Sequence, residues 1–308
     1  GLGIPAEPLF RSRDDYTTAE VVASQDDPYS GWQTIPEKIY YGEDCAVTSI
    51  GESAFEGCDG ITYLAIPSSI THIGKYAFRD CGSNMEVQIV NLAAWCKVEF
   101  GNEHSSPLSS AKKFYLKDSG AYAYKHEVKS LYIPNGVESI SNFAFYQCRS
   151  ITSLIIPGSV KSIGSSAFED CTGLTSIYLS EGVKSIGGSS FEGCTGITSL
   201  VLPSSLTSIA INAFKNCSSI NTIVSRIQSP FAFIENVFST YSTATVIVPE
   251  GTTTAYQSTS GWNLFENITD DSSQAPAKRT IHVTTAGTLP NLVSGDEFYI
   301  EELILTGE

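Results

Sequence analysis

The fold of this chain is decided by the stretch Ile151-Thr-Ser-Leu-Ile-Ile-Pro-Gly-Ser-Val-Lys-Ser-Ile-Gly-Ser-Ser-Ala-Phe-Glu-Asp-Cys171. Leu154 and Ile156 alternate with Ile155, and this period of two predicts a strand with one buried face. Pro157 ends the strand, because proline has no amide hydrogen to donate to a neighbouring strand. The stretch therefore opens with a short strand and a turn.

A second inward-facing segment follows the turn. Val160 and Ile163 are expected to point toward the core, and Gly164 lies where the chain is expected to bend sharply. The segment 165–168 suits a short helical or 3₁₀ turn with serine at its start. Each copy of the pattern thus predicts two short strands and one turn.

The same pattern recurs along the chain with a period of 23 residues. Its markers are a phenylalanine and, three positions later, a cysteine: Phe55, Phe78, Phe145, Phe168, Phe191 and Phe214, with Cys58, Cys81, Cys148, Cys171, Cys194 and Cys217. One such coil cannot bury its own apolar edge, so coils stack and place equivalent residues in columns. The long interval between Phe78 and Phe145 predicts two degenerate repeats.

Composition narrows the possible functions. The 308 residues carry a formal net charge of −15, with 42% apolar and 17% charged residues. The apolar share is ample for a core, which excludes wholesale disorder. An acidic chain lacks the lysine and arginine excess that nucleic acid or anionic lipid would require. No apolar run is long enough to span a membrane.

The repeat resembles a known family. The pattern L-x-I-P-x-S-V-x-S-I-G-x-x-A-F-x-x-C, which runs from Leu154 to Cys171, is similar to the BspA-like class of leucine-rich repeats. The resemblance implies an α/β repeat fold, a right-handed leucine-rich-repeat solenoid of stacked parallel strands. It also implies a surface or secreted protein of the kind found in Gram-negative anaerobes, and a role in binding matrix proteins or other cells.

Two further stretches resemble parts of such arrays. The block 91–101, followed by 107–108 and 114–116, looks like the divergent block found between repeats. The segment 246–251, together with 256–262, looks like the unit that closes the array. The resemblance therefore covers about residues 45–269.

We divide the chain into three parts. Residues 1–44 are expected to form an N-terminal lead-in that caps the first coil. Residues 45–269 form the solenoid, with degenerate repeats at about 82–127 and a closing unit at about 243–269. Residues 270–308 read as a linker and a short appendage, or as the start of a further, truncated domain.

The eight cysteines are predicted to be structural. Six form one column of the repeat and none lies in a C-x-x-C pair, so the spacing of a zinc ribbon is absent. Neighbouring coils bring these thiols near disulfide distance, but the side chains should point the same way. Buried free thiols that act as small hydrophobic groups are favoured. Cys45 and Cys96 lie off the column and could pair if the fold brings them together.

The remaining polar residues give no sign of catalysis. The four histidines have no i, i+4 spacing and read as solvent-facing side chains: His72, His104, His126 and His282. No nucleophile elbow, Walker loop or dinucleotide fingerprint is present. Four acidic pairs lack the alternation and glycine of a calcium loop and read as solvated surface: 14–15, 26–27, 43–44 and 270–271. We therefore predict no enzyme activity, no cofactor and no metal.

A binding surface is predicted on the outer face of the first strand. The outward position in successive copies is apolar or aromatic: Ala65, Tyr132, Ile155, Tyr178, Val201 and Val224. A flanking row adds hydroxyls and begins with Tyr63. Tyrosine is favoured at interfaces, so we expect Tyr63, Tyr132, Ile155, Tyr178 and Val201 to contact a partner. The alternative is that β-branched residues merely suit a strand, or that a second copy covers the row.

The functional hypothesis is an exported, non-catalytic binding protein at the cell surface or secreted, acting in adhesion or in recognition of host or cell-surface proteins. One alternative is a glycan-capture module, although sugar stacking favours tryptophan and Trp32, Trp95 and Trp262 all fall outside the regular coils. The other is a structural scaffold of the cell envelope. Nucleic acid is excluded as a partner, direct membrane insertion of this chain is not expected, and the oligomeric state is left open.

Overall fold

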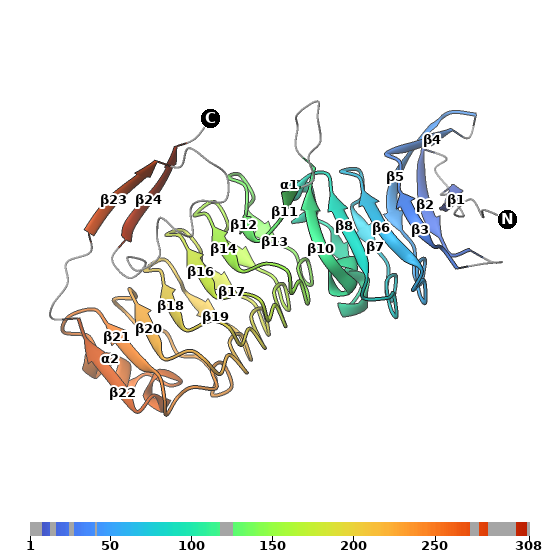
Figure 1. Ribbon diagram of the computed structural model, residues 1–308. Helices are drawn as coiled ribbons and strands as arrows, with labels where there is room; N and C mark the ends of the chain where they lie inside the picture. Colours follow the sequence, from blue (N-terminus) through green and yellow to red (C-terminus); the bar gives the residue numbers. More distant parts are fainter. Residues whose placement is uncertain are drawn as a thin grey trace.

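A computed structural model describes residues 8–12, 17–24, 28–40, 42–117, 126–271, 277–282 and 300–306. The chain winds into a long stack of coils, each of which contributes one main strand to the same side of the stack (Figure 1). The main strands are β3 (Gly31–Thr34), β6 (Ile61–Ile66), β8 (Met85–Ile89), β10 (Ala111–Leu116), β12 (Ser130–Tyr132), β14 (Ser153–Ile156), β16 (Ser176–Leu179), β18 (Ser199–Leu202), β20 (Thr222–Ser225), β21 (Thr245–Val248) and β22 (Asn267–Asp270). They pair in parallel as β3-β6-β8-β10, β12-β14-β16 and β18-β20-β21-β22.

Short strands form a second parallel ladder along another side of the stack. In the N-terminal half these are β2 (Thr18–Val22), β5 (Asp44–Ile50), β7 (His72–Ile73) and β9 (Glu99–Phe100). In the C-terminal half they are β13 (Ser139–Ile140), β15 (Ser162–Ile163), β17 (Ser185–Ile186) and β19 (Ser208–Ile209). The predicted solenoid of stacked parallel strands is therefore confirmed.

A third ladder replaces the helical turn that we expected at 165–168. The amides of Ser166, Phe168 and Asp170 donate to carbonyls of the next coil over 2.8, 2.8 and 2.7 Å. Ser166 and Asp170 have φ of 54° and 55°, in the left-handed region, and a run with such residues cannot be helical. The expectation of a short helix was wrong: the segment forms only isolated turns, in which the amide of Glu169 donates to the carbonyl of Ser166 over 3.4 Å, and the three amides above donate along the stack.

Phenylalanine rings form the centre of the core. The rings of Phe168 and Phe191 are stacked with centroids 5.3 Å apart and planes 3° from parallel. The column runs further than the sequence suggested: Phe238 stacks on Phe214 at 5.3 Å, and Tyr29 packs on Phe55 at 5.0 Å. Tyr29 thus gives the N-terminal lead-in its own residue in the column.

Gly164 is needed for a different reason from the bend that we expected. A Cβ atom there would lie 2.5 Å from the amide nitrogen of Asn142 and 2.7 Å from the carbonyl oxygen of Ile140, both in the preceding coil. Such distances are far inside van der Waals contact. The glycine therefore sets how closely two coils can approach.

The eight cysteines are free and buried. Within the column, the thiols of four of them donate to the carbonyl oxygen of a phenylalanine one coil earlier: Cys81 to Phe55 (3.1 Å), Cys171 to Phe145 (3.2 Å), Cys194 to Phe168 (3.2 Å) and Cys217 to Phe191 (3.0 Å). Each of these cysteines fills the core and also gives its phenylalanine carbonyl a second hydrogen bond, beside the one from the backbone amide three residues after that phenylalanine.

The two halves of the stack meet at an irregular block. It contains α1 (Leu92–Trp95), the 3₁₀ helices η1 (Glu103–Ser105) and η2 (Pro107–Ser110), and β11 (His126–Glu127), which pairs antiparallel with β10. The indole Nε1 of Trp95 donates to the carbonyl of Ala144 over 2.9 Å. This bond ties the irregular block to the first regular coil of the C-terminal half.

Additional strands and helices lie toward the two ends. Near the N-terminus, β1 (Leu9–Ser12) pairs antiparallel with β2, and β4 (Lys38–Tyr40) pairs antiparallel with β5. After β21 come α2 (Thr253–Ser258) and η3 (Trp262–Leu264), whose Tyr256 and Trp262 are fully buried. In the part predicted to be an appendage, β23 (Ala277–His282) and β24 (Ile300–Thr306) pair in parallel. The acidic pairs 14–15 and 26–27 lie outside the described residues.

Candidate functional site

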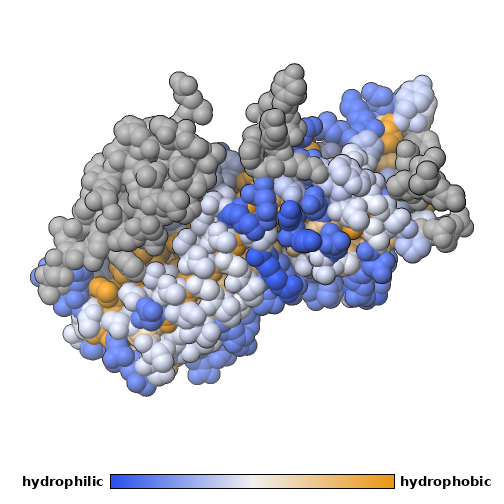
Figure 2. All heavy atoms as spheres, in the orientation of Figure 1, coloured by the Kyte–Doolittle hydropathy of each residue, from blue (hydrophilic) through white to orange (hydrophobic). Residues whose placement is uncertain are grey.

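The outer face of the main strands carries a continuous row in the C-terminal half. Ladder register places Tyr132 beside Ile155 and Ile155 beside Tyr178. The row consists of half-buried residues: Tyr132, Ile155, Tyr178, Val201, Val224 and Ile247. Figure 2 shows apolar side chains gathered in a band across the coils of this half, bordered by polar ones. The row is therefore a strip of apolar contact surface on a rigid sheet.

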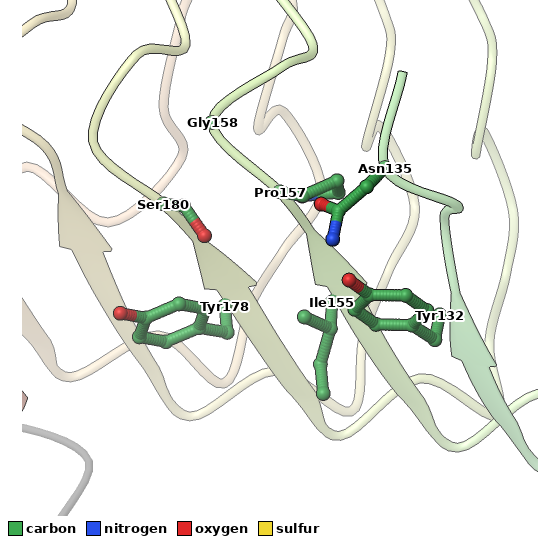
Figure 3. A pocket seen from close by; sticks show the side chains of 7 residues that line it. All are labelled: Tyr132, Asn135, Ile155, Pro157, Gly158, Tyr178 and Ser180. Atoms are coloured by element: carbon green, nitrogen blue, oxygen red, sulfur yellow. The ribbon is translucent and has the colours of Figure 1, made fainter. Parts of the chain in front are cut away.

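The strip is hollowed at its N-terminal end. A hollow of about 210 Å³ is lined by Tyr132, Asn135, Ile155, Pro157, Gly158, Tyr178 and Ser180. Figure 3 shows the two tyrosine rings on either side of the Ile155 side chain, with the other residues at the ends of the strands. Since the two tyrosines lie two strands apart, about 9.6 Å, the shorter isoleucine forms the floor between two aromatic walls.

The hollow has a polar margin beside its apolar floor. Burial raises the pKa of the Tyr132 phenol above 10.0, while a hydrogen bond with Asn135 acts in the opposite direction. The phenol thus stays protonated at neutral pH and can donate a hydrogen bond to a partner. Ser180 stands where other copies have proline, so a hydroxyl is exposed beside Tyr178. An apolar group with a polar end fits this arrangement.

Three of the five predicted contact residues come together here, namely Tyr132, Ile155 and Tyr178. Val201 lies next along the row, on β18. Tyr63 is different, because it lies on β6 in the N-terminal half and only 5% of it is exposed. The expectation that Tyr63 is an exposed contact residue was therefore wrong.

Neighbouring side chains explain why Tyr63 is covered. The ring of Trp32 lies 4.5 Å from the Tyr63 ring, and the Tyr63 hydroxyl donates to Oε1 of Gln88 over 2.6 Å. Ala65, also expected in the exposed row, is 8% exposed. The N-terminal half therefore presents a different outer face from the C-terminal half.

Sequence reasoning missed the position of Trp32. It placed this tryptophan outside the regular coils, whereas Trp32 lies on β3 in register with Tyr63. Residues 32–36 do carry the strand-then-proline signal, but Pro36 and Pro67 are 31 residues apart and not 23. The β4 hairpin accounts for the extra length. Because of this insertion, a search for the 23-residue period does not align Trp32 with the main strands.

The cysteine and histidine side chains have the surroundings of structural residues. In the described part of the chain, no three His, Cys, Asp or Glu side chains converge as a metal site would require. Burial raises the pKa of the Cys81 and Cys96 thiols to about 12, and a protonated thiol is a poor nucleophile. His72 is half-exposed, with its Nδ1 3.9 Å from Oε2 of Glu99.

None of the helices among the described residues has the length and apolar character of a membrane span.

Comparison with known proteins identifies the repeat. The family described as BspA type leucine rich repeat region matches in 6 copies over residues 37–102 and 118–245. No curated protein matches.

Several solved structures are similar. A leucine rich cell surface protein from Faecalibacterium prausnitzii is 18% identical, with 86% of this chain and 93% of that chain covered and a TM-score of 0.37. The leucine rich repeat protein of T. pallidum is 20% identical, with coverage of 70% and 78% and a TM-score of 0.38. The pneumococcal vaccine antigen PcpA is 13% identical, with coverage of 82% and 92% and a TM-score of 0.44. Identities and scores this low say nothing about function.

Proposed function

Because the chain belongs to the family of BspA-type leucine-rich repeat proteins, we propose that it is a non-catalytic binding protein that recognises another protein through the outer face of its main strands. We further propose that it is exported, to the cell surface or beyond, and acts in adhesion or in recognition of host or cell-surface proteins. Fold alone does not define a function, so the proposal depends on the site.

The hollow between Tyr132 and Tyr178 is the observation that carries the proposal. Tyrosine is enriched at the centre of protein interfaces because it supplies contact area at little cost in conformational entropy. The two rings and Ile155 together form a recess the size of one side chain. A partner residue that inserts there loses water on several sides at once, which is the property of an interface anchor.

The sheet around the hollow supports the same function. Its strands are held by parallel ladders on both sides of Ile155, so the surface is formed before a partner arrives. Preorganised contact surfaces lose less entropy on binding than mobile ones. The partly exposed hydroxyls of the row beside the strip offer polar groups to the margin of the interface: Ser130, Ser176, Ser199, Thr222 and Thr245.

The test is binding of the purified chain to an array of matrix proteins, cell-surface proteins and glycans. The Tyr132→Ser/Tyr178→Ser variant removes both walls of the hollow. Its matched control is Tyr40→Ser/Tyr146→Ser, which removes two tyrosines elsewhere. We expect saturable binding to a protein that is lost at least about tenfold in the first variant and kept in the control.

Three outcomes contradict the proposal. Equal loss in both variants would show that the strip is not the site. Binding to glycans alone would support a glycan-capture module. No saturable ligand would support a scaffold that spaces other domains.

A further inference from the structure

The second ladder of the C-terminal half ends earlier than the main ladder. It runs β13-β15-β17-β19, so β19 (Ser208–Ile209) is its last strand, whereas the main strands continue through β20, β21 and β22 (Figure 1). In the part of the chain that the structure describes, no strand pairs with the edge of β19 that faces the C-terminal end of the stack. This edge is therefore open.

The earlier strands of this ladder accept hydrogen bonds from the next coil at two carbonyls each. The carbonyl of Lys184, just before Ser185 of β17, accepts from the amide of Thr207 over 2.8 Å. The carbonyl of Ile186 accepts from the amide of Ala210 over 2.9 Å. The equivalent carbonyls in the coil of β19 are those of Thr207 and Ile209, and among the described residues no amide donates to either. Two backbone acceptors are thus available to an added strand.

The residues along this edge are open to solvent. Ser208 and Ala210 are exposed, whereas their equivalents in the preceding coil, Ser185 and Gly187, are half-buried. Ile211 comes next and is 48% exposed. The coil that follows β19 therefore does not cover it in the way that β19 covers β17.

An apolar groove of about 460 Å³ lies beside the open edge. Leu206, Ile227 and Phe231 form its apolar part, and its margin carries hydroxyls and one amide but no charged side chain. Leu206 stands where the preceding coil has Val183, and one period later the chain has Ser229. A serine fills less of this position than a branched apolar side chain does. The groove therefore has room for an uncharged apolar side chain.

The groove and the edge belong to one strand position of the repeat. In each regular coil of this half, an apolar residue stands two positions before the serine of the second-ladder strand, as in Leu206-Thr-Ser-Ile209. An added strand with this pattern places its apolar residue in the groove, and its next amides face the carbonyls of Thr207 and Ile209. Extended segments of other proteins bind exposed sheet edges in this way.

We propose that the open edge of β19 and the groove bind an extended peptide segment of another protein, which adds to β19 as a further parallel strand of the second ladder. The chain's own segments of this pattern are already paired inside its coils, so a second folded copy offers none of them. The site lies on another side of the stack from the Tyr132–Tyr178 hollow and does not depend on it.

A synthetic peptide with the sequence of residues 204–211 is a direct probe, because this segment adds to the edge of β17 in the same way. Its binding to the intact, isotope-labelled chain is followed by NMR. We expect saturable shifts at the amides of Ser208 and Ala210, since their peptide groups contain the carbonyls of Thr207 and Ile209. No saturable shift at millimolar peptide would overturn the proposal.

Peptide variants separate the two parts of the site without changing the protein. A peptide N-methylated at the two donor positions cannot donate and should bind at least about tenfold more weakly. A peptide with serine in place of its leucine loses the group that fills the groove and should also bind about tenfold more weakly. If the N-methylated peptide binds as well as the parent, the open edge is not the site.

Protein variants locate the binding. Phe231→Ser removes part of the groove and should weaken binding of the parent peptide, whereas Tyr40→Ser, at an exposed aromatic of the N-terminal half, should leave it unchanged. The proposal is also overturned if sedimentation shows a dimer that the peptide dissociates, since the occupant would then be a second copy. None of these results bears on the protein-binding strip, whose test uses different residues.

Discussion

The thiol of Cys194 donates a 3.2 Å hydrogen bond to the backbone carbonyl of Phe168 in the preceding coil. The repeat therefore couples its two marker residues across coils as well as within one, where the amide of Cys171 donates to the carbonyl of Phe168 over 3.3 Å. Phe168 in turn stacks on Phe145 and Phe191. The phenylalanine rings and the cysteine thiols thus form two columns that run side by side through the core.

Thiol reactivity follows from this burial. The thiols of Cys171 and Cys194 are buried, and their pKa is raised well above 9.0 chiefly because burial disfavours the thiolate. We expect a thiol reagent to label none of the eight cysteines in the folded protein within minutes, and all eight after unfolding. Failure to reach eight in the unfolded protein would reveal disulfides.

Stability should depend on alkaline pH for the same reason. Burial raises the pKa of the Cys217 thiol to about 12, against 9.0 for an unperturbed thiol. Above pH 9 the unfolded state loses a proton that the folded state keeps, so stability is complete below pH 9 and falls as pH rises toward 12. The loss is about 1.4 kcal/mol per pH unit for each such thiol.

Urea unfolding at pH 8 and pH 10.5 measures this dependence. Cys217→Ala removes one contribution and should make the decline with pH less steep. An unchanged slope in the variant would mean that this thiol does not titrate differently in the two states. Tyr256, whose pKa burial raises to about 12, contributes in the same direction in both proteins.

Phe168→Ala should be severely destabilising. The ring is fully buried and stacked on both faces, so its removal leaves a cavity that the neighbouring coils cannot fill. We expect a loss of about 3–5 kcal/mol in unfolding free energy. Lys161→Ala, on the exposed side of the same coil, should cost under about 0.5 kcal/mol. Similar losses in chemical denaturation would contradict the columnar core.

Ser190→Ala should stabilise the protein. Ser190 occupies a position that is alanine in the five other regular copies, and its buried Oγ has no hydrogen-bond partner. Removing an unsatisfied buried hydroxyl is expected to gain about 1 kcal/mol. The adjacent Ser189→Ala is the control, because its Oγ donates to Glu192 over 2.8 Å; it should not stabilise. A lower melting temperature for Ser190→Ala would refute the prediction.

Much of the fold follows from local periodicity. The inward positions Leu154 and Ile156 and the Phe168 column are visible in any one copy and are repeated in the others. The turn at 165–168 could not be predicted in the same way, because a serine such as Ser166 gives no sequence signal that its φ is left-handed. The available clue was the second left-handed position, four residues later and equivalent to Asp170, which is glycine or asparagine in three copies: Gly57, Gly193 and Asn216.

The site was partly predictable for a related reason. Tyr132, Ile155 and Tyr178 share one repeat position, so parallel register brings them together. Tyr63 occupies the flanking position in the repeat, but its environment depends on Trp32, which an insertion displaces from the 23-residue period. Long-range contacts of this kind depend on the insertion and not on the repeat.

All three hydrogen-bond ladders run along the axis of the stack, and this has a mechanical consequence. When the two ends of the chain are pulled apart, the force acts on the hydrogen bonds between the outermost coil and its neighbour, so the coils detach one after another. Each coil that detaches replaces one strand spacing of about 4.8 Å with 23 residues of extended chain, a gain of about 75 Å. A protein built this way would lengthen in steps under tension and so absorb work, keeping the coils that had not yet detached, and the hollow between Tyr132 and Tyr178, intact until their own boundary was reached.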